Sequence, residues 1–163
     1  MTRSPEFFTI GVYGKTEEEF FGALTAQGID TFLDIRQRRA VRGSKYAFVN
    51  SKRLQKRLGE LGIRYEHILA LAPTREIRQL QKEADRDSGT NKSNRQGLSL
   101  QFTEAYKGEI LDHFNTDQLI DHLSSQHSKK AVLFCVEEQA SACHRSIVAE
   151  RLARKLNINI MNL

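Results

Sequence analysis

The sequence predicts an α/β domain, a three-layer Rossmann-like fold with a mostly parallel sheet of about five strands. Short apolar runs suited to buried strands alternate with segments whose apolar residues recur at helical spacing. The runs Phe7–Val12 and Thr31–Ile35 flank one helical segment, and a strand–helix–strand unit of this length implies a parallel pair with a right-handed crossover. The 163 residues suit one ordinary domain, so we expect a single domain over residues 1–163.

The first strand leads into a glycine-containing turn and a capped helix. Thr16 and Glu19 fit a capping box, and Gly28 ends the helix. Gly14-Lys15-Thr16 invites comparison with a nucleotide triphosphate loop, but that loop needs a glycine where Thr9 stands. We therefore reject such a loop. Backbone amides in the turn could still meet an anion, and Lys15 is a candidate anion ligand.

The middle of the chain continues the alternation. A helix carrying Leu54 and Leu58 begins near Asn50 or Ser51, and Gly62 ends it. The further expected elements are a strand over 63–68, helices over 74–84, 99–114 and 116–125, a strand over 130–134, a helix around Val148 and Leu152, and a final strand over 158–163. Residues 85–97 are polar and rich in Gly, Ser and Asn, which indicates a mobile loop, either a cap over a site or a plain surface excursion.

The second strand runs into a basic segment. Its cations are Arg36, Arg38, Arg39, Arg42 and Lys45, with Tyr46 directly after them. Arginines with nearby aromatic residues can bind phosphate and stack on bases, so this segment is a candidate nucleic-acid surface; the alternative is a solvated basic loop. Arg36 directly follows a strand end and is expected to face the crevice there, where it could bind an anion.

The chemistry-bearing residues are concentrated between residues 134 and 145. Both cysteines lie there, together with Glu137, His144 and Arg145. If Ser141 caps the last helix, Cys143 and His144 fall in its first turn, where free backbone amides and the positive end of the helix dipole favour an anion. We expect Cys143 and His144 to take part in the chemistry, Glu137 to act as a base, and Arg145 to bind an anion.

Several alternatives remain for this segment. Cys143 could simply pack under the helix, and Arg145 could pair with Glu137 as a structural clamp. A phosphatase loop is absent, because Ser141 stands six positions after Cys135, where such a loop has arginine. A zinc site from Cys135, Cys143 and His144 would be strained, since adjacent residues rarely both reach one ion, so we predict no metal and no cofactor.

Composition bounds the class of protein. The net charge of +5 suits anionic partners such as phosphates or nucleic acid. No apolar run could span a bilayer, and residues 1–6 lack the apolar core of a secretory signal, so we expect a cytoplasmic protein with reduced thiols and no membrane partner. The oligomeric state is not predictable from these features.

Several short motifs together resemble a known family. They are Phe8-Thr9-Ile10-Gly11, Glu19-Phe20, Leu33-Asp34-Ile35-Arg36, Leu61-Gly62-Ile63-Arg64-Tyr65-Glu66-His67, Cys135-Val136-Glu137 and Cys143-His144-Arg145. In this order they resemble the domain-of-unknown-function 488 family over nearly the whole chain. Family members often carry a proline shortly after the segment that corresponds to Asp34–Arg36, and this chain has none there. The resemblance implies a fold and a site but no settled reaction.

The sequence therefore leads to two functional hypotheses. In the first, the protein is an enzyme that acts on a phosphate-bearing or nucleic-acid-related substrate, which it binds at an anion site at the carboxyl ends of the strands. The second is a non-catalytic nucleic-acid-binding module that uses Arg38, Arg39, Arg42 and Lys45.

Overall fold

The computed structural model describes residues 3–92 and 94–163; Met1, Thr2 and Ser93, the last within the predicted 85–97 loop, lie outside the described residues. Its strands form one sheet in the order β3-β2-β4-β1-β5, and all neighbouring pairs are parallel. The strands are β1 (Glu6–Ile10), β2 (Thr31–Asp34), β3 (Arg64–His67), β4 (Lys130–Phe134) and β5 (Met161–Asn162). The predicted fold class is confirmed.

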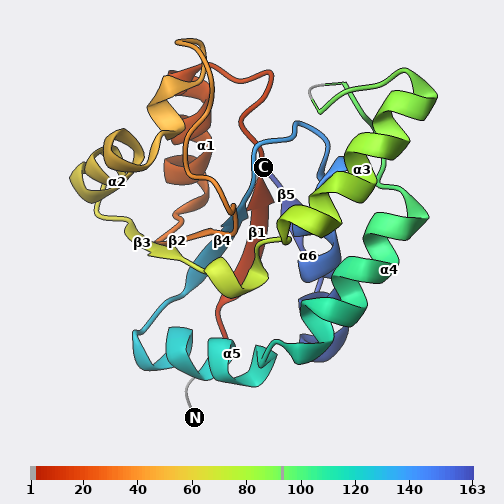
Figure 1. Cartoon of the computed structure of the whole chain (residues 1–163). Coiled ribbons are helices and arrows are strands. Elements are labelled where there is room, and N and C mark those ends of the chain that lie inside the picture. The colour runs from red at the N-terminus through yellow and green to blue at the C-terminus, as the bar shows by residue number, and fades with distance from the viewer. Residues whose placement is uncertain (1–2, 93) are drawn as a thin grey trace.

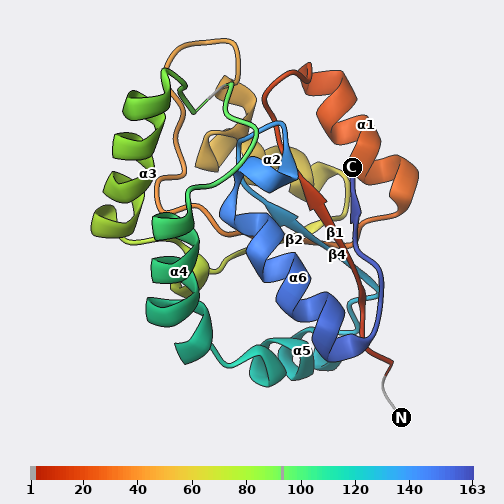
Figure 2. The ribbon, with the colours of Figure 1, turned by 90° about the vertical axis from the view of Figure 1, so that its right-hand side faces the viewer.

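Helices cover both faces of the sheet. They are α1 (Glu17–Gln27), α2 (Ser51–Glu60), α3 (Arg75–Ser88), α4 (Leu100–Glu109), α5 (Thr116–Ser125) and α6 (His144–Leu156). Figure 1 shows α1 and α2 on one side of the sheet and α3, α4 and α6 on the other. In Figure 2 α6 lies in front of the strands, and in both views α5 lies beyond their amino ends. Among the described residues, no helix has the length and apolarity needed to cross a membrane.

The core lies on both faces of the three central strands. All four residues of β2 are buried, as are the last four of β1 and of β4, whereas the edge strand β3 is half exposed. Burial on both faces is typical of inner strands of a parallel sheet. Under α1, the ring of Phe20 lies 5.5 Å from that of Phe134, and the ring of Phe32 lies 5.1 Å from that of Phe134. Each aromatic contact of this kind adds about 0.5–1.5 kcal/mol beyond area burial.

The predicted helix ends are partly confirmed. Thr16 and Glu19 form the capping box, and Gly28 adopts the left-handed conformation that ends α1. The third helix does not stop near Ala84 but continues to Ser88, because Asp85 accepts a 2.8 Å hydrogen bond from Gln81 within the helix. The last strand is confined to Met161–Asn162.

Candidate functional site

The loops after β1 and β4 meet at the carboxyl edge of the sheet. These strands are neighbours, and their following helices, α1 and α6, lie on opposite faces (Figure 1). The amides of Val12 and Tyr13 both donate to the carbonyl of Val136 at 3.0 Å, which fixes one loop against the other. This is the switch point of the sheet, where ligands bind in open α/β folds.

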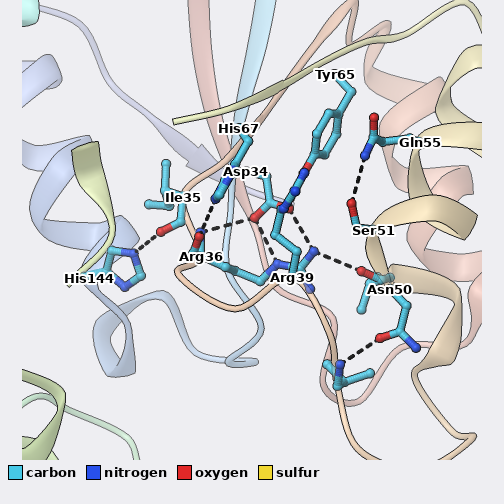
Figure 3. A network of polar contacts seen from close by, with 12 residues as sticks. Asp34, Ile35, Arg36, Arg39, Asn50, Ser51, Gln55, Tyr65, His67 and His144 are labelled. Atoms are coloured by element: carbon cyan, nitrogen blue, oxygen red, sulfur yellow. Dashed lines mark hydrogen bonds and ion pairs between the residues drawn. The ribbon is translucent and has the colours of Figure 1, made fainter. Parts of the chain in front are cut away.

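Cys135, Cys143 and His144 converge at this edge. Their sulfur and imidazole nitrogen atoms all lie within 4.8 Å of one another, and the three side chains are buried. The Cys143 Sγ is 3.7 Å from His144 Nδ1. His144 Nε2 lies 2.9 Å from the carbonyl oxygen of Ile35, at the end of β2 (Figure 3). Because a carbonyl only accepts, Nε2 carries the hydrogen, and in the neutral ring Nδ1 keeps its lone pair for the sulfur side.

The backbone explains how adjacent residues reach one point. Cys143 is the N-cap of α6 with extended backbone angles, φ −140° and ψ 147°, and His144 is the first helical residue. The change from extended to helical backbone turns the two side chains toward the same place. The geometric objection to a shared ligand set is therefore wrong. The expectation that Ser141 caps α6 is also wrong: Ser141 lies in a short 3₁₀ helix, and its hydroxyl donates to the carbonyl of Gln96.

Burial shapes the electrostatics of this cluster. The hydrogen bond with Cys143 and burial raise the pKa of the Cys135 thiol to about 12. Burial alone would lower the pKa of His144. The charge of Cys135 and the hydrogen bonds with Cys135 and the Ile35 carbonyl favour the protonated imidazole more strongly, so the pKa is raised. The ring of Tyr106 packs edge-on against His144, with centroids 5.4 Å apart, and the Tyr106 hydroxyl donates to the carbonyl of Leu71 at 2.6 Å.

Glu137 adds a carboxylate to the same edge. Its side chain is buried, and its Oε2 has no hydrogen-bond partner among the described residues. Burial and then the charge of Cys135 raise its pKa, although Lys92 and a hydrogen bond from Cys143 act in the opposite direction. A buried carboxyl group with an unused oxygen can hold or transfer a proton.

The segment between α3 and α4 covers this carboxylate. Arg95 Nη2 lies 3.9 Å from Glu137 Oε1 and 3.4 Å from Asp85 Oδ2. Burial alone would lower the pKa of the Lys92 ammonium group. The negative charge of Glu137, together with other neighbouring groups, has the larger effect, so the pKa of Lys92 is raised. Arg95 and Gln96 of the predicted 85–97 segment therefore contact this edge, and the role of the segment as a cap stays a prediction.

Arg145 is the most enclosed cation of the site. Its side chain is fully buried, and it donates to the carbonyls of Glu137 at 2.6 Å and Glu138 at 3.2 Å. Gly11 allows the β1 loop to pass close to the Glu137 carbonyl, because a Cβ at this position would lie 1.9 Å from that oxygen. Arg145 thus ties the β4 loop in place. Its role as an anion ligand stays a prediction.

Arg36 is also held internally. Its Nε and Nη2 pair with the two carboxylate oxygens of the buried Asp34 at 2.9 and 2.8 Å, and Tyr65 donates to the same carboxylate at 2.8 Å (Figure 3). The guanidinium also lies 4.7 Å from the centre of the Phe134 ring. Arg36 Nη1 has no partner among the described residues, and its anion role stays a prediction.

The other predicted cations lie further out. Arg38, Arg42 and Lys45 are exposed, whereas Arg39 is half-buried with Nη1 3.5 Å from the Tyr65 hydroxyl. Lys15 is half-buried on the β1 loop, and burial together with the charge of Arg145 lowers its pKa.

The structure adds two arginines that the sequence analysis did not single out. Burial and the neighbouring charges of Arg38 and Arg75 lower the pKa of Arg78, with Glu76 as the opposing charge. Arg78 Nε is buried and without a partner among the described residues. A signal was present in the sequence: Arg75 and Arg78 stand in the first turns of a helix that Thr74 caps, where the helix dipole disfavours cations.

Comparison with known proteins gives one match. The model of the family described as "Domain of unknown function DUF488" matches residues 16–152. No curated protein and no solved structure matches the chain. The match spans the capped first helix, the basic segment and the Cys143-His144-Arg145 triplet. The chain belongs to the DUF488 family.

Proposed function

We propose that the protein is an enzyme that acts on a phosphate-bearing substrate at the carboxyl edge of the sheet. In this proposal Arg38, Arg75 and Arg78, here called the arginine cluster, hold the phosphate. Cys143, His144 and Glu137 carry the chemistry. The observation that carries the proposal is that Arg38 and Arg75 stand close along the chain to Ile35 and Leu71, whose carbonyls hold His144 and Tyr106.

The first of these relations lies at the end of β2. Ile35 accepts the hydrogen bond of His144, and Arg38 follows three residues later, a stretch that spans at most about 11 Å. The second relation involves Tyr106, which contacts the His144 ring and donates to Leu71, four residues before Arg75. Arg38 and Arg75 therefore each stand three or four residues from a carbonyl that accepts a hydrogen bond from His144 or Tyr106.

The charge balance of the cluster favours an anion. The neighbouring charges that act on Arg78 are those of two other arginines, Arg38 and Arg75, and of one carboxylate, Glu76. Arg75 and Arg78 also stand at the amino end of α3, where the helix dipole repels cations and attracts phosphate. A bound phosphate would relieve this repulsion and accept the paired N–H groups that arginine offers.

The adjoining centre offers the groups for chemistry. Two sulfur atoms and an imidazole nitrogen lie together in a buried place, and the buried Glu137, whose Oε2 has no partner among the described residues, follows two residues after Cys135. In such a low-dielectric site, charges that develop in a reaction are strongly stabilised by nearby polar groups. Because Arg95 lies over Glu137, a substrate that reaches this carboxylate would have to move the Arg95 side chain aside.

The binding half of the proposal is tested with pyrophosphate and adenosine monophosphate as probes, by calorimetry at low salt. The wild-type chain should bind at least one of them, and Arg78→Gln should weaken that binding by about tenfold or more. Arg154→Gln is the matched control, because Arg154 is an exposed helical arginine paired with Glu150, and it should bind like the wild type. Equal binding by Arg78→Gln and Arg154→Gln would contradict the arginine cluster as the phosphate site.

The catalytic half is tested by phosphorus NMR of nucleotide and phosphoester mixtures incubated with the protein. Conversion of a compound by the wild type, and its loss in Cys143→Ser with pyrophosphate binding unchanged, would support an enzyme. A compound converted equally by both proteins would remove Cys143 from the reaction.

A second function has one observation in its favour. Arg38, Arg42 and Lys45 are exposed along one loop, and among the described residues they have no ion-pair partner. Such a row could follow a nucleic-acid backbone as a non-catalytic module. Single-stranded oligonucleotides would then bind with affinity that falls steeply with salt and is indifferent to Cys143→Ser.

A further inference from the structure

We propose that Cys135, Cys143 and His144 bind a zinc ion through their two sulfur atoms and Nδ1. The proposal goes beyond the phosphate site, because the three ligands are complete without the arginine cluster. Only the use of the ion in a reaction rests on the proposed function.

The separations suit one ion. With Zn–S distances of about 2.3 Å and Zn–N distances of about 2.0 Å, two ligands of a tetrahedral zinc lie about 3.5–3.8 Å apart. Cys143 Sγ and His144 Nδ1 are 3.7 Å apart, and all three ligand atoms lie within 4.8 Å of one another. The ligand atoms are therefore already close to the separations of a tetrahedral zinc site.

The imidazole is already oriented for a metal. Histidine ligands commonly donate their second ring N–H to a carbonyl or carboxylate, which fixes the tautomer. His144 does this with Ile35, and the ring is held further by Tyr106. The lone pair of Nδ1 is consequently left on the side of the two sulfurs.

The donor set indicates which ion would bind. Two thiolates and one imidazole suit a borderline-soft ion, whereas magnesium and calcium prefer oxygen ligands. When zinc binds, each thiol loses its proton to the solvent, so that both sulfurs enter as thiolates.

Glu137 is the carboxylate nearest in the chain to these three ligands. Three protein ligands and one open place are typical of catalytic zinc, whereas structural zinc has four protein ligands. Glu137 stands two residues after the ligand Cys135, and its Oε2 is buried and without a partner among the described residues. It could bind the ion itself or hold a water molecule on it, and in the second case the water would be the nucleophile of the proposed enzyme.

The test is a cobalt(II) titration of the reduced, metal-free full-length protein. One equivalent of cobalt should give thiolate-to-cobalt charge-transfer absorption and the strong visible bands of tetrahedral cobalt, and zinc should abolish both. Cys143→Ser and His144→Ala should each weaken binding by about 100-fold or more. His122→Ala, an exposed histidine outside the cluster, should titrate like the wild type.

The wild-type titration decides the proposal even if a variant fails to fold. Absence of charge-transfer absorption, or the weak spectrum of octahedral cobalt, would overturn it, as would unchanged binding in folded Cys143→Ser. Protection of both cysteines from a thiol reagent by zinc alone is a second expected result; equal labelling with and without zinc would contradict the site. Zinc binding without pyrophosphate binding would remove the proposed substrate class and leave the metal site, and the reverse result would remove only the metal.

Discussion

Replacing Gly11 with alanine should damage the site through a single methyl group. The added Cβ would lie 1.9 Å from the carbonyl oxygen of Glu137 and 3.0 Å from Nη2 of Arg145. Real Cβ contacts shorter than 3.0 Å essentially do not occur, so the carbonyl must retreat by about 1.1 Å. That carbonyl also accepts the 2.6 Å hydrogen bond of the buried Arg145, which must move or break with it.

The expected loss of stability follows from these contacts. Overpacking of this kind costs about 1–3 kcal/mol, and weakening a hydrogen bond of a buried charged group costs about 1–3 kcal/mol. We therefore expect Gly11→Ala to lower the free energy of unfolding by about 3–4 kcal/mol. With an m-value of about 2 kcal/mol/M, the urea midpoint would fall by about 1.5–2 M.

Equilibrium urea unfolding followed by circular dichroism measures this change. Gly22→Ala is the matched control: Gly22 lies inside α1, and a Cβ there would meet nothing within 4 Å. Alanine is the better helix former, so the control should gain about 0.5–1 kcal/mol. Neither glycine is in the left-handed region, so the comparison isolates the steric contact. A midpoint for Gly11→Ala within about 0.3 M of the wild type would refute the close approach of β1 to the Glu137 loop.

Three further predictions concern the frame of the site. Burial, together with the charge of Asp34, raises the pKa of Tyr65 to about 12, so ultraviolet titration should show one tyrosine ionising near that pH, a step absent in Tyr65→Phe. The neutral hydroxyl then stabilises the fold fully below pH 10, and that contribution is lost as the pH rises toward 12. Burial alone would raise the pKa of Asp30, but hydrogen bonds from Thr31 and the start of β4 outweigh it and lower the pKa below 3.8. Asp30→Asn should cost about 1–2 kcal/mol at neutral pH, and this difference should shrink in urea melts as the pH falls below 3.8; a constant difference would contradict the hydrogen-bonded carboxylate. Thr16→Ala removes the side-chain cap of α1 and should cost about 1 kcal/mol in the same assay, whereas no loss would place the helix start elsewhere.

Local patterns explain why much of the fold was predictable. Thr16, Glu19 and Gly28 act through contacts within a few residues, so propensity and spacing identify the ends of α1 correctly. The pairing of β1 with β4 follows from the rules for parallel sheets, and it brings the Gly11 turn beside the cysteine loop.

The site depends on contacts that no local pattern encodes. His144 is oriented by Ile35, 109 positions earlier in the chain, so its tautomer could not be predicted from its neighbours. Ser141 has the intrinsic preference for an N-cap, but its hydroxyl is taken by Gln96, and α6 begins at His144. Cys143 and His144 reach one point because Cys143 stands at the change from extended to helical backbone, which their spacing in the sequence does not reveal.

The arginine cluster shows the same limit. The sequence places Arg38 in a basic run and Arg75 and Arg78 in a helix, with nothing to connect the two segments. Arg38 and Arg75 both act on the charge of Arg78, although Arg38 stands 40 positions earlier in the chain. Residues distant in sequence therefore form the proposed phosphate site, and composition alone indicates no more than a basic protein.

The most direct test of the central claim is an NMR titration with pyrophosphate, followed through the arginine side chains and the imidazole of His144. If the phosphate site adjoins the reaction centre, the signals of Arg78 and His144 should shift together, with one saturation curve. Shifts confined to Arg42 and Lys45, with His144 unmoved at saturation, would contradict the account and favour a surface that binds nucleic acid without chemistry.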